Sequence, residues 1–212
     1  RCQKLESSFD RAFNASSGLK AGYERWHYEA AILREFMRRT HQYVTSVPNE
    51  KDFIEWLALM RHYGAPTRLL DFTYSHNIAA YFAFSSFKQA SRAVWAISAG
   101  WLMQATERIL SKDDLRKPEN FVKHCFNTES PEDFVVPLNA ERMNERLTIQ
   151  QGTFLCPGNI GKSFNENLIS LQPTAGSIVQ FLIPHKERNK VLTELKHMNI
   201  SNATLFPDLD GF

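Results

Sequence analysis

The sequence breaks at Gly64-Ala65-Pro66, between two stretches whose apolar residues recur at helical spacing. Phe53, Trp56 and Met60 give the stretch before the break one apolar face, and residues 78–84 after it are mostly apolar. A glycine just past the last periodic residue, followed by a proline, is typical of a helix C-terminus. The fold must therefore accommodate a forced turn between two helices that both bury apolar surface.

Periodicity and capping residues predict four helices. Asn49 has the chemistry of an N-cap, with Asp52 three residues later, and Asn199 or Asn202 is expected to end the last helix. The chain from Ala65 to Thr73 is predicted to be irregular. The expected helices are Tyr23 to Val44, the segment from Asn49 to the break, Thr73 or Ser75 to about Phe87, and Glu187 to Met198.

The second half of the sequence favours strands. Short apolar segments at 93–97 and 153–155 fit strands, and 177–184 is apolar enough to be central in a sheet. No repeat or Gly/Ser/Pro-rich linker divides the chain, so residues 1–212 are predicted to form one domain. The expected fold class is α+β, with a helical N-terminal half packed on a β-rich C-terminal half.

Composition excludes several classes of protein. The 12% aromatic content is too high for a disordered chain, and no apolar run reaches the length of a membrane span. Residues 1–6 lack the apolar segment of a signal peptide, so we expect a cytoplasmic protein without a membrane partner. Three unpatterned cysteines, Cys2, Cys125 and Cys156, predict neither a disulfide scaffold nor a metal site.

The polar segment around the break has two interpretations. In the structural one, Arg68 pairs with Asp71, Asp71 or Thr73 caps the next helix, and Thr67 bonds the loop backbone. In the functional one, Arg68 holds an anionic group, bidentately if it is a phosphate, and His62 orients a substrate or transfers a proton.

Arginines on the first predicted helix suggest a second polar surface. Arg34 and Arg38 are four residues apart and share a helix face, with Arg39 beside them. They are candidates for contacts with the phosphates of RNA or DNA, and a solvated helix face is the alternative. Three tryptophans on apolar faces are expected in the core: Trp26, Trp56 and Trp95.

Residues 61–73 also resemble a known signature. Their sequence, Arg-His-Tyr-Gly-Ala-Pro-Thr-Arg-Leu-Leu-Asp-Phe-Thr, is similar to the central motif of the FRG domain family, with Arg61 and Phe72 as departures. The resemblance extends to segments 4–11, 79–83, 146–154 and 205–211. The N-terminal aromatic-Arg-Gly of the family is missing, and Arg1 is the candidate for its arginine.

The resemblance implies an ADP-ribosyltransferase-like architecture that uses NAD as substrate and needs no metal. Such chemistry requires a cation for the pyrophosphate, a polar cradle for nicotinamide, and a late polar group at the reacting ribose. The implied catalytic residues are His62, Arg68, Asp71 and Gln151. The implied NAD-binding residues are Arg1, Tyr63, Thr67, Thr73 and Gln150.

Two features of this assignment stay open. A glutamine does not titrate, so the carboxylate would have to come from Asp71, Glu141 or Glu145. For Gln150-Gln151-Gly152, the structural alternative is the start of a strand with side-chain amides bonded to backbone.

The resemblance suggests a bacterial toxin–antitoxin or antiviral-defence setting. The acceptor would be RNA, DNA or protein, and an antitoxin or chaperone is an expected partner. NAD hydrolysis and non-enzymatic nucleotide or phosphate binding are the alternatives. A nuclease ranks last because no acidic cluster has metal-ligand spacing.

Overall fold

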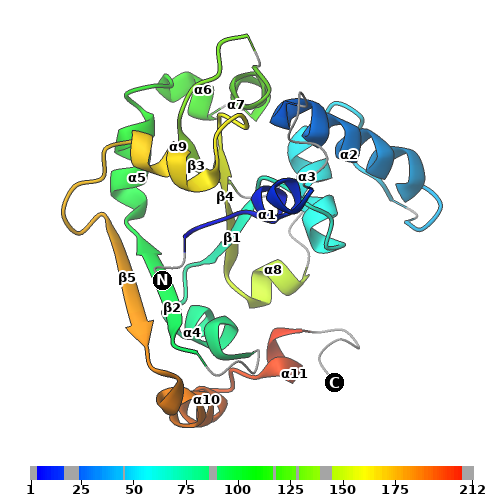
Figure 1. Ribbon diagram of the computed structural model, residues 1–212. Coiled ribbons are helices and arrows are strands. Elements are labelled where there is room, and N and C mark those ends of the chain that lie inside the picture. Colours follow the sequence, from blue (N-terminus) through cyan, green and yellow to red (C-terminus); the bar gives the residue numbers. More distant parts are fainter. Residues whose placement is uncertain are drawn as a thin grey trace. The chain divides into compact units, whose positions relative to one another are not determined.

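The computed structural model describes residues 4–16, 24–44, 46–85, 90–116, 118–127, 129–138 and 145–206 (Figure 1). They form a mixed α/β fold that divides into two compact units. Unit 1 comprises Arg1–Leu70, Ala99–Glu141 and Leu155–Pro173; unit 2 comprises Asp71–Ser98, Arg142–Phe154 and Thr174–Phe212. That residues 1–212 form one domain stays a prediction, and Arg1 and Glu141 lie outside the described residues.

Unit 1 is predominantly helical. Its elements are α1 (Ser8–Ala15), α2 (Arg25–Thr40), α3 (Phe53–His62), α5 (Ala99–Thr106), α6 (Lys112–Arg116), α7 (Pro118–Cys125), β3 (Val135–Leu138) and α9 (Phe164–Ser170). Strand β4 (Gly152–Pro157) ends in this unit and is the middle strand of a three-stranded sheet with the order β1-β4-β3. Among the fully buried side chains of unit 1 are Phe9, Met60, Phe134 and Phe164.

Unit 2 contains a two-stranded sheet and four α-helices within its described residues. The elements are β1 (Leu70–Thr73, beginning at the last residue of unit 1), α4 (His76–Ser85), β2 (Arg92–Ile97), α8 (Glu145–Ile149), β5 (Ile178–Ile183), a 3-10 turn (His185–Glu187), α10 (Arg188–His197) and α11 (Asn202–Leu205). Strands β2 and β5 pair antiparallel and lie side by side in Figure 1. Helices α4, α10 and α11 contribute a small core of Ile78, Tyr81, Leu195 and Leu205.

The helices around the break match their sequence signals with shifted ends. Helix α2 was predicted over 23–44 and is observed over Arg25–Thr40. Helix α3 ends at His62, and Gly64 follows with φ of 74°, as a helix C′ glycine requires. The predicted N-cap Asn49 is wrong, because the Asp52 carboxylate accepts the hydrogen bond from the Glu55 amide.

The chain after the break is more regular than predicted. Leu70–Thr73 forms strand β1, where the sequence suggested irregular chain up to Thr73. At the start of α4, the Ser75 hydroxyl accepts a hydrogen bond from the Ile78 amide at 3.4 Å. Thr73 instead accepts from the Ser75 amide at 3.1 Å, so the cap lies two residues later than Thr73.

The predicted division into a helical first half and a β-rich second half is wrong. After residue 98 the described chain contains seven α-helices and three strands. Strand β5 was expected to be central in a sheet, but it pairs with β2 in a sheet of two strands. Its Phe181 and Leu182 are 54% and 67% exposed, so an apolar run does not here indicate burial on both faces. None of the described helices is both long and apolar enough to cross a membrane.

Candidate functional site

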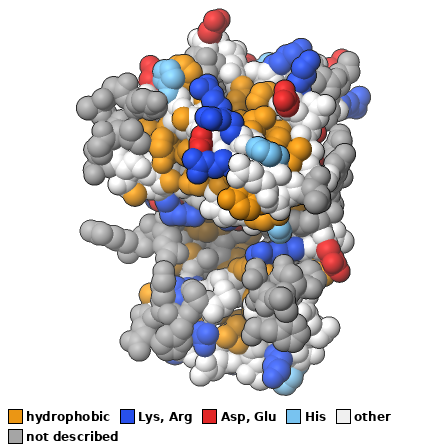
Figure 2. All heavy atoms as spheres, turned by 90° about the vertical axis from the view of Figure 1, so that its right-hand side faces the viewer, with side chains coloured by type: hydrophobic (Ala, Val, Ile, Leu, Met, Phe, Trp, Pro, Cys, Tyr) orange, Lys and Arg blue, Asp and Glu red, His pale blue; other side chains and the backbone are white. Residues whose placement is uncertain are grey.

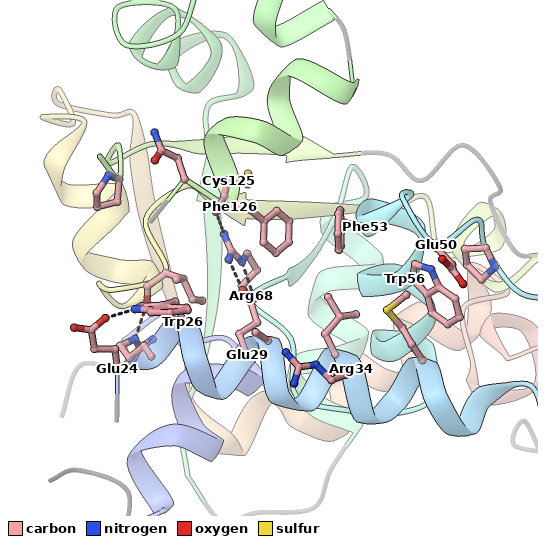
Figure 3. A pocket seen from close by; sticks show the side chains of 18 of the residues that line it. Glu24, Trp26, Glu29, Arg34, Glu50, Phe53, Trp56, Arg68, Cys125 and Phe126 are labelled. Carbon is pink, nitrogen blue, oxygen red and sulfur yellow. Dashed lines mark hydrogen bonds and ion pairs between the residues drawn. The ribbon is translucent and has the colours of Figure 1, made fainter. Parts of the chain in front are cut away.

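Unit 1 contains a cavity of about 1220 Å³. Helix α2 forms one wall, and α3, the end of α7 and the loop after β4 contribute the others (Figure 3). Four aromatic side chains line it: Trp26, Phe53, Trp56 and Phe126. In the space-filling view, on the face that carries α2, basic side chains lie among hydrophobic ones (Figure 2).

A buried ion pair lies in the wall of this cavity. The Arg68 side chain is 1% exposed, and its Nε donates to Glu29 Oε1 at 2.7 Å while its Nη2 donates to Glu29 Oε2. Figure 3 shows the Arg68 and Glu29 side chains pointing toward each other within the cavity wall. The Arg68 guanidinium also lies over the Phe126 ring, 4.7 Å from its centroid.

Backbone carbonyls occupy the third nitrogen of Arg68. Its Nη1 donates to the carbonyls of Cys125 at 2.8 Å, Gly158 at 3.1 Å and Pro157 at 3.3 Å. Burial alone would disfavour the charged guanidinium, but the charge and hydrogen bonds of Glu29 outweigh it and raise the pKa of Arg68 above its usual range. Arg68 therefore stays charged and joins α2, α7 and the chain after β4.

This geometry agrees with the structural interpretation of Arg68 and corrects its partner. The predicted carboxylate was that of Asp71, whereas the one that Arg68 binds is that of Glu29. Each guanidinium nitrogen already donates to a protein oxygen, so Arg68 has no nitrogen left free for a phosphate. Sequence reasoning missed Glu29, although a signal exists: Glu29 lies three residues after Trp26 and four before Leu33, inside the apolar stripe of α2.

Gly158, whose carbonyl accepts a hydrogen bond from Arg68, yields a prediction about stability. A Cβ at Gly158 would lie 2.6 Å from Cδ1 of Phe134, whose ring is fully buried and would have to shift. Gly158→Ala is therefore expected to lower the free energy of unfolding by about 1–3 kcal/mol in a urea titration. Gly100→Ala, in α5 with no atom near the added Cβ, is the matched control and should be neutral or slightly stabilising. Equal stability of the two variants would contradict the close packing at Gly158.

A second ion pair holds the N-terminal end of α2. Arg25 pairs with the buried Asp10 of α1, and its Nε donates to the Ile160 carbonyl at 2.7 Å. Asp10 also accepts from the Phe164 amide, at 3.2 Å, and from Ser7. These bonds connect α1, α2 and α9, and they fix the part of the cavity that Arg25 and Ile160 line.

The three arginines proposed for nucleic acid differ in their surroundings. Arg38 and Arg39 both pair with Glu35, Arg38 at 3.6 Å. Arg34 makes no hydrogen bond or ion pair within the part of the chain that the structure describes, and its exposed side chain extends beside the cavity (Figure 3). Arg34 and Arg38 line the cavity, and Arg39 is not part of its lining. Trp26, expected in the core, is half-buried at this cavity.

The other predicted residues of unit 1 lie outside the cavity lining. His62 and Tyr63 end α3 with exposed side chains, and their rings are 4.9 Å apart. Thr67 is fully buried, but its backbone makes the loop contacts: its amide donates to Ser8 Oγ at 3.0 Å, and its carbonyl accepts from Phe9. The prediction that the Thr67 hydroxyl bonds the loop backbone is wrong, because Oγ1 has no hydrogen-bond partner among the described residues.

In unit 2, three predicted residues come together through backbone bonds. Thr73 Oγ1 donates to the Gln150 carbonyl at 2.8 Å, and the Tyr74 amide donates to the Gln151 carbonyl at 3.0 Å. The Gln150 side-chain amide donates to the Leu205 carbonyl at 3.0 Å, which is the structural alternative predicted for this motif. Gln151 is exposed in the left-handed region with φ of 47°. The carboxylate candidates Asp71 and Glu145 are also exposed residues of this unit.

Unit 1 is thus a helical unit with an aromatic-lined cavity whose wall contains a buried Arg–Glu pair. The family model of the FRG domain matches residues 2–92, which include the signature at 61–73. Residues 2–92 are therefore similar to the FRG domain, as the signature predicted. No curated protein and no solved structure matches the chain. The resemblance of the later segments, 146–154 and 205–211, stays a prediction.

Proposed function

We propose that the cavity of unit 1 binds NAD and that the protein transfers ADP-ribose from it to an acceptor. One observation carries the binding part: aromatic side chains line the same cavity as Arg34, which has no ion-pair partner among the described residues. Aromatic rings stack on bases, and a guanidinium binds phosphate oxygens. A ligand with both features is a nucleotide.

The size of the cavity supports a dinucleotide over a mononucleotide. Pockets for drug-sized ligands are typically about 300–1,000 Å³. At about 1220 Å³, this cavity has room for two bases, two riboses and a pyrophosphate. The transfer reaction and the ADP-ribosyltransferase-like architecture rest on the family resemblance and remain proposals.

The structure changes the residues to which we assign roles. Arg34, with Arg38 four residues later, replaces Arg68 as the proposed phosphate contact. Trp26 and Phe53 are the proposed stacking surfaces. In the transfer, the bond between nicotinamide and the ribose breaks, the acceptor oxygen or nitrogen bonds to the ribose carbon, and the acceptor loses a proton. Within unit 1, His62 is an exposed candidate for proton transfer.

The binding proposal predicts a specific loss in one variant. Arg34→Ala should weaken NAD binding about tenfold or more, because a hydrogen-bonded charge on the phosphate is removed. Arg39→Ala is the matched control: it is on the same helix and exposed, and it lies outside the cavity lining. Isothermal titration of NAD and AMP against both variants measures the effect. Equal affinity of the two variants, or no binding of either ligand to the unmodified protein, would contradict the proposal.

Turnover requires a separate assay. The protein is incubated with NAD labelled in the adenosine part, together with RNA, DNA or protein. Label on an acceptor supports transfer, and nicotinamide release without labelled acceptor indicates NAD hydrolysis. Binding without either result would leave a non-enzymatic nucleotide-binding module. That alternative is favoured by the full occupancy of Arg68, the residue on which the catalytic assignment first rested.

A further inference from the structure

Two of the three cysteines lie in contact inside unit 1. Cys125, the last residue of α7, and Cys156, in β4, place their sulfur atoms 4.0 Å apart. Both are free thiols, and their residues are 4% and 2% exposed. They are 31 positions apart in the sequence, so the fold brings them together.

Both cysteines are part of the framework that holds Arg68. The Cys125 carbonyl accepts from Arg68, and so do the carbonyls of the two residues that follow Cys156. Cys125 also lines the cavity, and its neighbour Phe126 stacks on the guanidinium. A change in the distance between the two cysteines would therefore act on the three carbonyls and, through Arg68, on Glu29.

We propose that Cys125 and Cys156 form a disulfide on oxidation and that this bond reshapes the cavity wall at the Arg68–Glu29 pair. A disulfide has an S–S length of about 2.05 Å, so the sulfurs must approach by about 2 Å from their present 4.0 Å. The α7 end and the chain after β4 must then move toward each other. The effect on ligand binding rests on the proposed nucleotide function, whereas formation of the bond does not.

The reaction balances with a peroxide as oxidant. One thiolate attacks hydrogen peroxide, giving a sulfenic acid and, after a proton is taken up, water. The second thiol then attacks that sulfur, the disulfide forms and a second water leaves. Two thiols are oxidised and one peroxide is reduced to two waters.

The buried environment lowers the reactivity of the Cys125 thiol near neutral pH. Burial raises the pKa of the Cys125 thiol well above its usual value, and the hydrogen bond and charge of Cys156 raise it further. Because the thiolate is the nucleophile, oxidation should be slow near neutral pH and faster as the pH rises.

The test uses the full chain with Cys2→Ser, which removes the third thiol. Peroxide treatment of the native protein should remove two hydrogen atoms from its mass, and peptide mapping without reductant should link Cys125 to Cys156. Tryptophan fluorescence, reported by Trp26 and Trp56 at the cavity, should change and be restored by dithiothreitol. The Cys2→Ser/Cys156→Ser variant is the control and should show neither the link nor the reversible change.

Ligand binding is a third readout. NAD affinity should fall by about fivefold or more in the oxidised protein and recover on reduction. Absence of the linked peptide after prolonged oxidation at raised pH would overturn the inference. A disulfide that leaves both tryptophan fluorescence and NAD affinity unchanged would overturn its coupling to the cavity. If neither form binds NAD, the proposed function fails, and the fluorescence change still decides whether the wall is reshaped.

Discussion

Replacing Arg68 with alanine is expected to lower the free energy of unfolding by about 3–5 kcal/mol. The change would leave the Glu29 carboxylate buried without its partner and would remove the donor to the carbonyls of Cys125, Pro157 and Gly158. The cost of stranded buried charge is larger than the net value of the intact pair, because Glu29 has almost no access to water. Urea unfolding followed by circular dichroism measures the loss.

Two further variants separate charge from packing. Arg38→Ala removes an exposed partner of Glu35 and should cost less than about 1 kcal/mol. The double variant Arg68→Met/Glu29→Leu removes both charges and should recover much of the stability lost in Arg68→Ala. If Arg68→Ala unfolds like the unmodified protein but no longer binds NAD, then Arg68 is a ligand-binding residue after all, and the structural assignment is wrong.

Features that depend on local sequence could be predicted. The end of α3 follows from Gly64, whose positive φ is easy for glycine and costly for other residues. Strand β2 and helix α10 follow from short-range periodicity, and Asn199 takes a positive φ just after α10 ends. These signals require no knowledge of what lies across the fold.

Features that depend on partners far away in the sequence could not be predicted. Glu29 and Arg68 are 39 residues apart, and the carbonyls that Arg68 binds come from more distant segments still. The sequence indicates that a buried arginine needs acceptors, but it does not indicate which ones. Strand β1 is short and has mixed polarity, so its own residues do not indicate a strand. Its extended conformation depends on pairing with β4.

The signature residues of unit 1 illustrate why a motif can mislead about chemistry. A polar residue in an apolar segment indicates either a ligand contact or a hydrogen bond within the protein. The same type of side chain serves both roles, so the residue type alone does not distinguish them. Arg68 bonds to the Glu29 carboxylate, and Thr67 makes its contacts through the backbone. The cavity is lined by Arg68 and also by residues from helical periodicity, such as Trp26 and Phe53. In this unit, some residues that hold the wall together, such as Arg68 and Arg25, therefore also line the cavity.

The same logic applies to Asp10 in the early part of the family segment. Asp10→Ala should lower the free energy of unfolding by about 3 kcal/mol, because it strands Arg25 and leaves the Phe164 amide without an acceptor. Asp10→Asn keeps an acceptor oxygen but presents amide hydrogens to Arg25, so a smaller loss of about 1–2 kcal/mol is expected. Denaturant titration of both variants provides the measurement, with the exposed Asp113→Ala as a control near zero.

A second readout distinguishes an anchor from a general loss of stability. Arg25 also donates to the Ile160 carbonyl, and both residues line the cavity, so loss of Asp10 should loosen that part of the wall. At a temperature where the Asp10→Asn variant is fully folded, its NAD affinity should fall while hydrogen exchange increases at residues 159–161. If exchange there is unchanged although the free energy of unfolding falls, Asp10 stabilises α1 alone, and its bonds do not hold the cavity in shape.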